Sequence, residues 1–141
     1  MIELDNRTDA DIDIDRLQTI ADSLSEQDIE LIFTDDNEMR AINLEFRQID
    51  RSTDVLSFPY ETMPMSPLGS IVISVDFAKE ASNRFSHTLN DEIALLFIHG
   101  LLHLLGFDHE SDNGEMRQKE RELIVKFSLP SSLIVRTEEG N

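Results

Sequence analysis

The sequence contains no cysteine and no tryptophan, and only one of its 141 residues is tyrosine. Without cysteine the chain cannot form a disulfide, a thiolate metal site or a cysteine nucleophile, so any metal must bind to histidine and oxygen ligands. No basic, apolar segment at the N-terminus resembles a signal peptide, and no apolar run reaches the ~18 residues of a membrane span. These absences predict a cytoplasmic protein that has no membrane partner.

Basic residues are also scarce, because 12 Lys and Arg stand against 29 Asp and Glu, a net charge of −17. The imbalance is greatest in residues 1–40, which hold 13 acidic and 3 basic side chains. Loose, sequence-independent binding to nucleic acid depends on a positive field that this chain lacks. A small basic or metal-centred cleft within an acidic, solubilising exterior is still compatible with the composition.

The pattern of apolar residues predicts one globular domain that spans residues 1–141. Alternating and short apolar runs predict strands in the first half of the chain, and apolar residues at helical spacing predict helices that crowd the second half. An α/β or α+β domain with one small sheet accounts for this order. The predicted strands are 2–4, 28–34, the end of 51–59, and 70–74; the predicted helices are 14–24, 36–46, 76–85, 90–105 and 113–127. In the second helix we expect Met39, Ile42 and Phe46 to point inward.

Three of the four histidines fall in HGLLHLLGFDH, residues 99–109. The helix that carries His99 and His103, capped by Asn90, is apolar on nearly all sides, which is typical of a buried helix, and its two histidines lie one turn apart on one face. A left-handed Gly106 would end the helix and let His109 return to that face. Three imidazoles would then hold one divalent ion with an open coordination position, at the C-terminal end of a buried helix. Ordinary core histidines would each need a separate hydrogen-bond partner.

The fourth histidine, His87, lies outside this pattern, and we predict it at the surface. The spacing H-x-x-x-H-x-x-G-x-x-H matches a metzincin protease signature, except that Gly100 replaces the catalytic glutamate. Without that acid/base group peptide hydrolysis is disfavoured, whereas a phosphodiester supplies its own anionic oxygens to a metal. Because glycine has no side chain, Gly100 either leaves space for a bulky substrate group beside His99 or lets the helix pack closely against its neighbours.

Two segments together resemble the YbeY family of bacterial single-strand endoribonucleases, which act in ribosomal RNA maturation. The first is HGLLHLLGFDH with the residues that follow it, and the second is NLEFRQIDRSTDVLSFPYE, residues 43–61. The resemblance implies an α+β domain with a small mixed sheet and about five helices. The following residues match the remainder of the first motif: Asp112, Met116 and Glu120.

The resemblance also implies a site and an activity. One zinc ion per chain would be held by His99, His103 and His109, and Arg47 would be the cleft arginine that acts with them in catalysis. The activity would be metal-dependent cleavage of single-stranded RNA in ribosomal RNA maturation and ribosome quality control, particularly 3′-end processing of small-subunit ribosomal RNA. The alternative is a non-catalytic ribosome-assembly or RNA-binding factor whose metal is structural or vestigial.

Arg47 also suits a phosphate ligand on chemical grounds, because a guanidinium can donate two parallel hydrogen bonds to phosphate oxygens. Asn43 lies one turn before it on the same predicted helix face. The alternative for Arg47 is a surface charge or an ion pair with Asp50 or Asp54.

No general acid is identifiable from the sequence. Asp108 and Glu110 flank the third histidine, and either could act as an acid or orient an imidazole. In the strand at 69–74, Ser70 stands where the family usually has aspartate, so we expect a carboxylate near the cleft to be missing. The acidic composition further predicts that RNA is recognised with the help of a basic partner, such as a ribosomal protein or the small ribosomal subunit.

Overall fold

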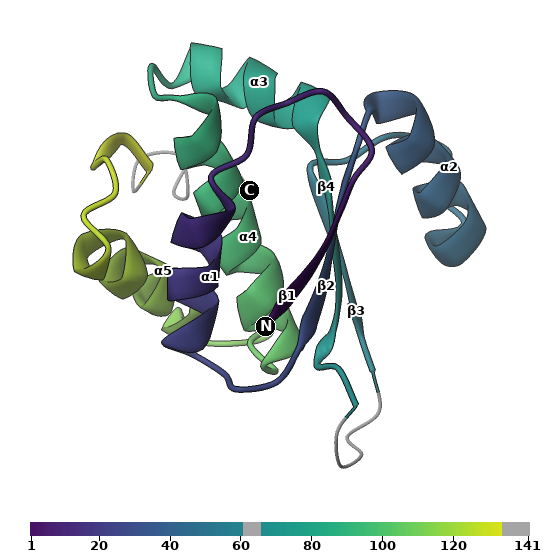
Figure 1. Cartoon of the computed structure of the whole chain (residues 1–141). Coiled ribbons are helices and arrows are strands. Elements are labelled where there is room, and N and C mark those ends of the chain that lie inside the picture. The colour runs from purple at the N-terminus through teal and green to yellow at the C-terminus, as the bar shows by residue number, and fades with distance from the viewer. Residues whose placement is uncertain (61–65, 134–141) are drawn as a thin grey trace.

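A computed structural model describes residues 1–60 and 66–133 of the chain. It contains one sheet of four strands in the order β1–β2–β4–β3 (Figure 1). β1 and β2 are parallel, as are β2 and β4, whereas β3 and β4 are antiparallel, so the sheet is mixed and β3 lies at one edge. The strands are β1 (Ile2–Asn6), β2 (Ile29–Thr34), β3 (Val55–Pro59) and β4 (Gly69–Ser74).

Five helices surround this sheet, and together they confirm the predicted α+β domain. Figure 1 shows α1, α4 and α5 on one side of the sheet and α2 alone on the other. Every predicted helix is present, with ends that differ from the prediction by at most two residues. The helices are α1 (Ile14–Asp22), α2 (Asp36–Arg47), α3 (Val75–Arg84), α4 (Leu89–Leu104) and α5 (Glu115–Lys126).

The central strand β4 is buried on both faces, which explains why its sequence is apolar without alternation. Ile71 and Ile73 belong to the main core, which also contains most of α4. Val72 points to the other face, where it packs with Met39 of α2 and Leu56 of β3. The sheet therefore separates a large core beneath α1, α4 and α5 from a small core beneath α2.

A capping box fixes the start of α4, and its N-cap lies two residues before Asn90, the predicted cap. Thr88 is the N-cap: its hydroxyl accepts a hydrogen bond from the Asp91 N–H, and the Asp91 carboxylate accepts one from the Thr88 N–H. Asn90 instead ties α4 to the segment before α1. Its Nδ2 donates to the carbonyl oxygen of Asp11, and its Oδ1 accepts from the N–H of Asp13.

His87 is buried rather than at the surface, because its side chain is only 1% exposed. Its Nε2 lies 2.8 Å from Oε1 of Glu92, and its Nδ1 lies 3.1 Å from Oγ of Ser132. The prediction of a surface residue was wrong because both partners come from other elements, one of them 45 residues away. This cluster joins the first turn of α4 to the end of the described chain.

Phe46 is also misplaced by the sequence pattern, since its residue is 60% exposed while Met39 is fully buried. The buried residues of α2 are Met39 and Asn43, in the middle of the helix, whereas its last turn is exposed. The Phe46 ring packs instead against Phe58 of β3, with ring centroids 5.5 Å apart and planes tilted by 60°. The end of α2 therefore leaves aromatic surface open to solvent.

Among the described residues, no helix combines the length and the apolar character that a membrane crossing requires.

Gly69 gives a test of how tightly the sheet packs on α4. A Cβ atom there would lie 2.5 Å from the carbonyl oxygen of Phe58 and 2.6 Å from Cδ2 of Leu104. Gly69→Ala should therefore lower the free energy of unfolding by about 1–3 kcal/mol, because backbone must move to make room. Urea denaturation measures the change. Asn83→Ala on the exposed side of α3 is the control, and equal stability of the two variants would contradict the packing.

Candidate metal centre and cleft

The three histidines of HGLLHLLGFDH converge, as their spacing predicted. His99 and His103 project from the last turns of α4, and Gly106 has a φ of 100°, which returns the chain toward them. With His109 they offer three ligand atoms that all lie within 4.8 Å of one another. Their ring centroids are 4.7 to 5.5 Å apart. The cluster could thus hold a single metal ion at the C-terminal end of a buried helix.

Hydrogen bonds at the far side of two rings fix how these imidazoles face the cluster. Nδ1 of His99 donates to Oε1 of Glu120 at 3.0 Å, and Nδ1 of His103 donates to the carbonyl oxygen of Phe107 at 3.0 Å. A carbonyl oxygen can only accept, so Nδ1 of His103 carries the hydrogen; in the tautomer in which Nδ1 of His99 likewise donates to Glu120, each Nε2 presents a lone pair. These two Nε2 atoms lie 3.2 Å apart. Facing lone pairs without a proton between them fit a shared cation.

His103 is biased toward the neutral form that binds metal. Burial lowers its pKa, and the neighbouring His99 and His109 lower it further when they are charged. The hydrogen bond to Phe107 and the charge of Asp108 act in the opposite direction without reversing the shift. Because a proton and a metal compete for the same lone pair, a lowered pKa favours metal binding at neutral pH.

Glu120 comes from α5 and is 4% exposed. The start of α5 is set by Asp112, whose carboxylate accepts hydrogen bonds from the N–H groups of Gly114 and Met116. Met116 and Leu123 bury the same stripe of the helix, and Glu120 lies between them at helical spacing. Its orienting role was not assigned from the sequence. The signal that could have revealed it is a carboxylate within an otherwise apolar stripe.

Asp108 and Glu110, the candidates on either side of His109, do not orient an imidazole through any hydrogen bond found in the described residues. Oδ1 of Asp108 accepts from the N–H of Glu110, and its Oδ2 accepts from the hydroxyl of Ser111. These two bonds lower the pKa of Asp108, with smaller contributions from the histidine charges. Asp108 is therefore held as a carboxylate in the turn after α4, and Glu120 takes the orienting position instead.

A cleft of about 620 Å³ extends from the histidines toward β3 and the end of α2. Arg47, the last residue of α2, lines this cleft with Asp54 and Pro59. No ion pair involves Arg47 within the described parts of the chain, and Asp50 is paired with Arg40 at 2.7 Å. The structure therefore brings Arg47 and the three histidines to one cleft, although they are more than 50 residues apart in sequence.

Asn43 does not accompany Arg47 into the cleft. Its residue is only 2% exposed, and its Nδ2 donates to the carbonyl oxygen of Arg51 at 2.9 Å. Gln48, with a φ of 58°, ends the helix and starts the return of the chain toward β3. Asn43 thus holds the loop that follows Arg47, and it positions the cleft wall rather than a ligand.

Comparison with known proteins decides which family this site belongs to. The sequence profile described as "Endoribonuclease YbeY" matches residues 4–128. The chain belongs to the YbeY endoribonuclease family. A relative from Nautilia profundicola named endoribonuclease YbeY is 61% identical over 139 residues, which cover 99% of this chain and all of the relative. A relative of the same name from Sulfurimonas denitrificans is also 61% identical, over 98% of this chain and 99% of its own.

Likeness to a solved structure supports the fold alone. A solution structure of a protein from Thermotoga maritima aligns with a TM-score of 0.61 and 23% sequence identity, over 90% of this chain and 89% of that one. The four-stranded sheet and the helices described above therefore form an arrangement shared with a distant protein.

Gly100, the residue that distinguishes this YbeY family motif from the protease signature, serves close packing rather than space beside His99. A Cβ at Gly100 would lie 2.9 Å from Cγ2 of Ile71 and 3.3 Å from Cγ2 of Val55. The carbonyl oxygen of Gly100 accepts a hydrogen bond from the hydroxyl of Ser57 at 3.1 Å. The side of α4 that carries Gly100 is thus filled by the sheet, and a substrate cannot enter there.

Ser70, which replaces the aspartate usual in the YbeY family, lies away from the histidines. It points to the sheet face that α2 covers, and its hydroxyl donates to Oε2 of Glu30 at 2.8 Å. The expectation that a carboxylate is missing from the metal cleft was therefore wrong. Alternation along a strand sends Ser70 and Ile71 to opposite faces, and a carboxylate is present beside Ser70 because Glu30 is its register partner on β2.

The contact between Glu120 and His99 predicts an effect on metal affinity. Glu120→Gln should weaken zinc binding about 10- to 100-fold, because the amide is a poorer acceptor for Nδ1–H than the carboxylate. Competition with a chelator of known affinity measures the change. Glu122→Gln is the matched control, since Glu122 is exposed on the same helix. Equal zinc affinities of the two variants would contradict an orienting role for Glu120.

Proposed function

We propose that this chain is a cytoplasmic, zinc-dependent endoribonuclease that cuts single-stranded RNA, with residues 1–141 acting as one domain. The observation that carries the proposal is the single cleft shared by three converging histidines and Arg47. Membership of the YbeY family, whose named relatives are endoribonucleases, supports the reaction class. The biological role we infer is ribosomal RNA maturation and ribosome quality control, particularly 3′-end processing of small-subunit ribosomal RNA.

The chemistry divides between the histidines and the chain around them. Bound by His99, His103 and His109, zinc would act as a Lewis acid toward a phosphoryl oxygen and would lower the pKa of a water molecule. Glu120 and the Phe107 carbonyl hold two of the imidazoles with Nε2 toward the substrate side. This preorganisation means that the rings need not reorient when substrate arrives.

Arg47 is suited to bind the phosphate that is cut. Its guanidinium lies at the end of α2, exposed at the wall of the cleft and without an ion-pair partner among the described residues. A phosphodiester can therefore accept its hydrogen bonds without displacing a carboxylate. As the bond to the leaving oxygen breaks, negative charge grows on the phosphoryl oxygens, and a guanidinium bound to them stabilises that charge.

Few groups in the cleft could act as the general acid that donates a proton to the leaving oxygen. Asp108 lines the cleft, but its lowered pKa keeps it ionised, which disfavours it as a general acid. Glu110 lines the same cleft and is the other carboxylate beside His109. Since the cleft is open, solvent can also supply this proton.

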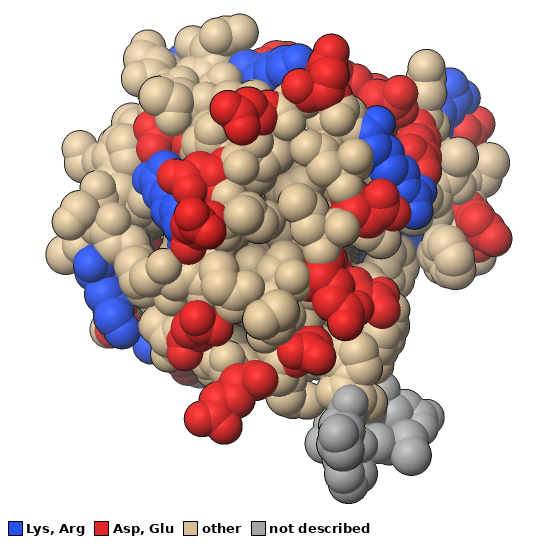
Figure 2. All heavy atoms as spheres, viewed as in Figure 1, with Lys and Arg blue, Asp and Glu red and all other residues tan. Residues whose placement is uncertain are grey.

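The overall charge bears on how RNA reaches the cleft. Acidic side chains are spread over the face in Figure 2, with basic side chains between them. A surface of this kind, on a chain with net charge −17, does not attract RNA from a distance. We therefore infer that a basic partner, such as a ribosomal protein or the small ribosomal subunit, presents the RNA.

A non-catalytic assembly or RNA-binding factor with a structural metal is the second candidate. Its support is the absence of the protease glutamate at Gly100 together with the acidic surface. Structural zinc sites are almost always closed by four protein ligands. Within the described residues the cluster contains three, which leaves a coordination position for a substrate or water and favours the enzyme.

Arg47→Ala tests the phosphate contact directly. The rate of cleavage of a defined single-stranded RNA should fall about 100-fold or more, because a charged donor to the phosphoryl oxygens is lost, while zinc content stays unchanged. Arg40→Ala, on the same helix but paired with Asp50 outside the cleft, is the matched control. If both variants cut RNA at the wild-type rate, Arg47 has no part in catalysis.

His103→Ala separates the enzyme from the assembly factor. The variant should remain folded, bind zinc much more weakly, cut no RNA above the background of a mock purification, and fail to restore ribosomal RNA processing in cells that lack the protein. Zinc content, RNA cleavage and the 3′ end of small-subunit ribosomal RNA are measured on the same variant. A folded, metal-free variant that restores processing would favour the assembly factor.

A further inference from the structure

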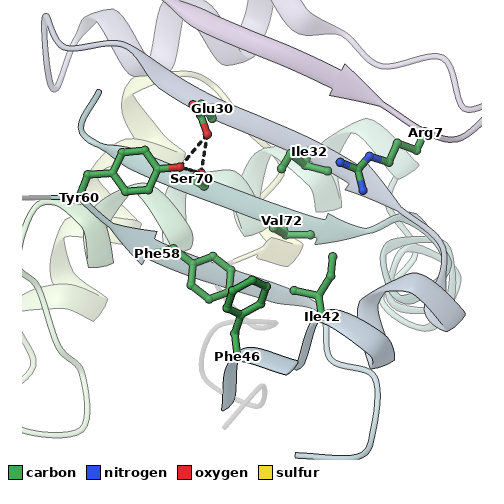
Figure 3. Close-up of a pocket in the computed structure, with 9 residues that line it drawn as sticks. All are labelled: Arg7, Glu30, Ile32, Ile42, Phe46, Phe58, Tyr60, Ser70 and Val72. Atoms are coloured by element: carbon green, nitrogen blue, oxygen red, sulfur yellow. Dashed lines mark hydrogen bonds between the residues drawn. The ribbon is translucent and has the colours of Figure 1, made fainter. Parts of the chain in front are cut away.

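A second hollow lies on the sheet face opposite the histidines and has no part in the proposed chemistry. This groove, of about 410 Å³, is bounded by β2, β4, β3 and the side of α2 (Figure 3). Its floor is apolar, with Arg7 at one end and the side chains of Tyr60, Ser70 and Glu30 at the other. Its volume is within the range of small-ligand sites.

Aromatic rings form the open wall of the groove. Phe46 is 60% exposed and Tyr60 is 41% exposed, both unusual for such large side chains. Figure 3 shows the Phe46 ring beside that of Phe58, and their planes are tilted by 60°. Since Phe46 is 60% exposed, its ring offers surface on which another planar group can pack. Exposed rings of this kind are what unpaired nucleobases stack on.

The polar end of the groove presents a hydrogen-bond acceptor, the carboxylate of Glu30. The hydroxyls of Tyr60 and Ser70 both lie within hydrogen-bond distance of Oε2 of Glu30, at 2.7 and 2.8 Å. Ser70 acts to lower the pKa of Tyr60, but the hydrogen bond to Glu30, burial and the charge of Glu30 together raise it, so the phenol stays protonated. The two hydroxyl oxygens are themselves 2.6 Å apart, so Tyr60, Ser70 and one oxygen of Glu30 form a closed hydrogen-bonded cluster. The other oxygen, Oε1, accepts no hydrogen bond from the described residues and is available to an N–H group of a ligand.

The charges of the groove exclude phosphate as its occupant. The guanidinium of Arg7 is already bound by Asp5 at 2.9 Å and by Glu38. Glu30 adds a negative charge at the opposite end. An uncharged planar ring with N–H donors satisfies both the aromatic wall and the carboxylate, whereas a phosphate would meet net repulsion.

The groove and the metal cleft share two walls. On the edge strand β3, Pro59 lines the cleft and its neighbour Phe58 lines the groove. At the end of α2, Arg47 lines the cleft and its neighbour Phe46 lines the groove. Phe58 and Pro59 point to opposite faces of the sheet, so this end of β3 lies between the two hollows. An RNA chain whose phosphate lies beside Arg47 can reach the groove by passing over this edge.

We propose that the groove binds the base of a nucleotide near the cleaved bond, stacked on Phe46 and with its exocyclic amino group donating to Glu30. The proposal rests on the proposed nuclease function and adds a specificity subsite to it. It favours adenine, cytosine and guanine, which have an exocyclic amino group, over uracil, whose only base-edge donor is the ring N3–H. Base pairing would occupy that amino group, so the subsite also selects single-stranded RNA.

The test uses the zinc-loaded full chain and short single-stranded RNAs in which one nucleotide at a time, near the cleaved bond, is abasic. With wild type, one position should lose about 5- to 150-fold in cleavage efficiency, the range expected for one stacked base. In Phe46→Ala the intact RNA should be cut less efficiently, and the abasic change at that position should have no further effect. Leu44→Ala, which is 48% exposed on the same helix outside the groove, should behave as wild type.

A second measurement detects ligand binding in the groove without depending on RNA cleavage. Tyr60 is the only tyrosine, so protein labelled with fluorotyrosine gives a single ¹⁹F signal. AMP and CMP should shift this signal to a saturating value, and UMP should shift it less. The signal of His103→Ala protein should respond to these nucleotides as wild type does. The signal of Phe46→Ala protein should not shift with any of them.

The two measurements give different answers for the two proposals. Wild type that cuts RNA with the same abasic profile as Phe46→Ala would overturn the subsite and leave the nuclease standing. Wild type that cuts no RNA would overturn the nuclease, and the ¹⁹F titration would then decide separately whether the groove binds bases. A signal that responds to a basic, apolar peptide but to none of the nucleotides would overturn the subsite in favour of a protein-docking groove.

Discussion

The structure depends on the close approach of α4 to the sheet. At Gly100 the helix comes so near that a single methyl group would press on Ile71, and the hydroxyl of Ser57 reaches the helix backbone. With the Gly100 side of α4 fixed against β3 and β4, the adjoining face of the helix holds His99 and His103 beside the edge strand, in the cleft that Val55 and Ser57 also line. Gly100, which stands where the protease signature has its catalytic glutamate, therefore also sets the position of the histidines. Its close packing against the sheet fixes α4 and with it the geometry of the site.

Other parts of the fold complete the site around this helix. The hydrogen bonds of Asp112 fix where α5 begins, and this places Glu120 beside His99. The turn through Gly106 brings His109 back to the other two rings. α2 contributes Arg47 from the opposite side of the sheet, where Asn43 anchors the loop behind it. The contact of Glu120 with His99, and the meeting of Arg47 with the three histidines, join segments far apart in sequence, so the cleft forms only when the whole domain is folded.

Features that depend on local spacing could be predicted from the sequence, and features that depend on distant partners could not. The helical spacing of His99 and His103, and a glycine that ends the helix before His109, were sufficient for the cluster. The burial of His87 could not be predicted, because its partners Glu92 and Ser132 come from other elements. The same holds for Phe46, which lies in the exposed last turn of α2 and packs against Phe58 of β3 rather than in the core. Ser70 was assigned to the wrong face because periodicity alone does not say which face of a strand adjoins the metal.

The two-sided edge strand β3 has a consequence for how proteins of this family can diverge. Phe58 and Pro59 on β3, and Phe46 and Arg47 at the end of α2, belong to different hollows. Substitutions at Phe46 or Phe58 change one surface, while Arg47 and the histidines keep their surroundings on the other. A few substitutions can therefore change which ligands the groove accepts without disturbing the metal cluster. The reason is that the two sets of side chains lie on opposite sides of the strand backbone.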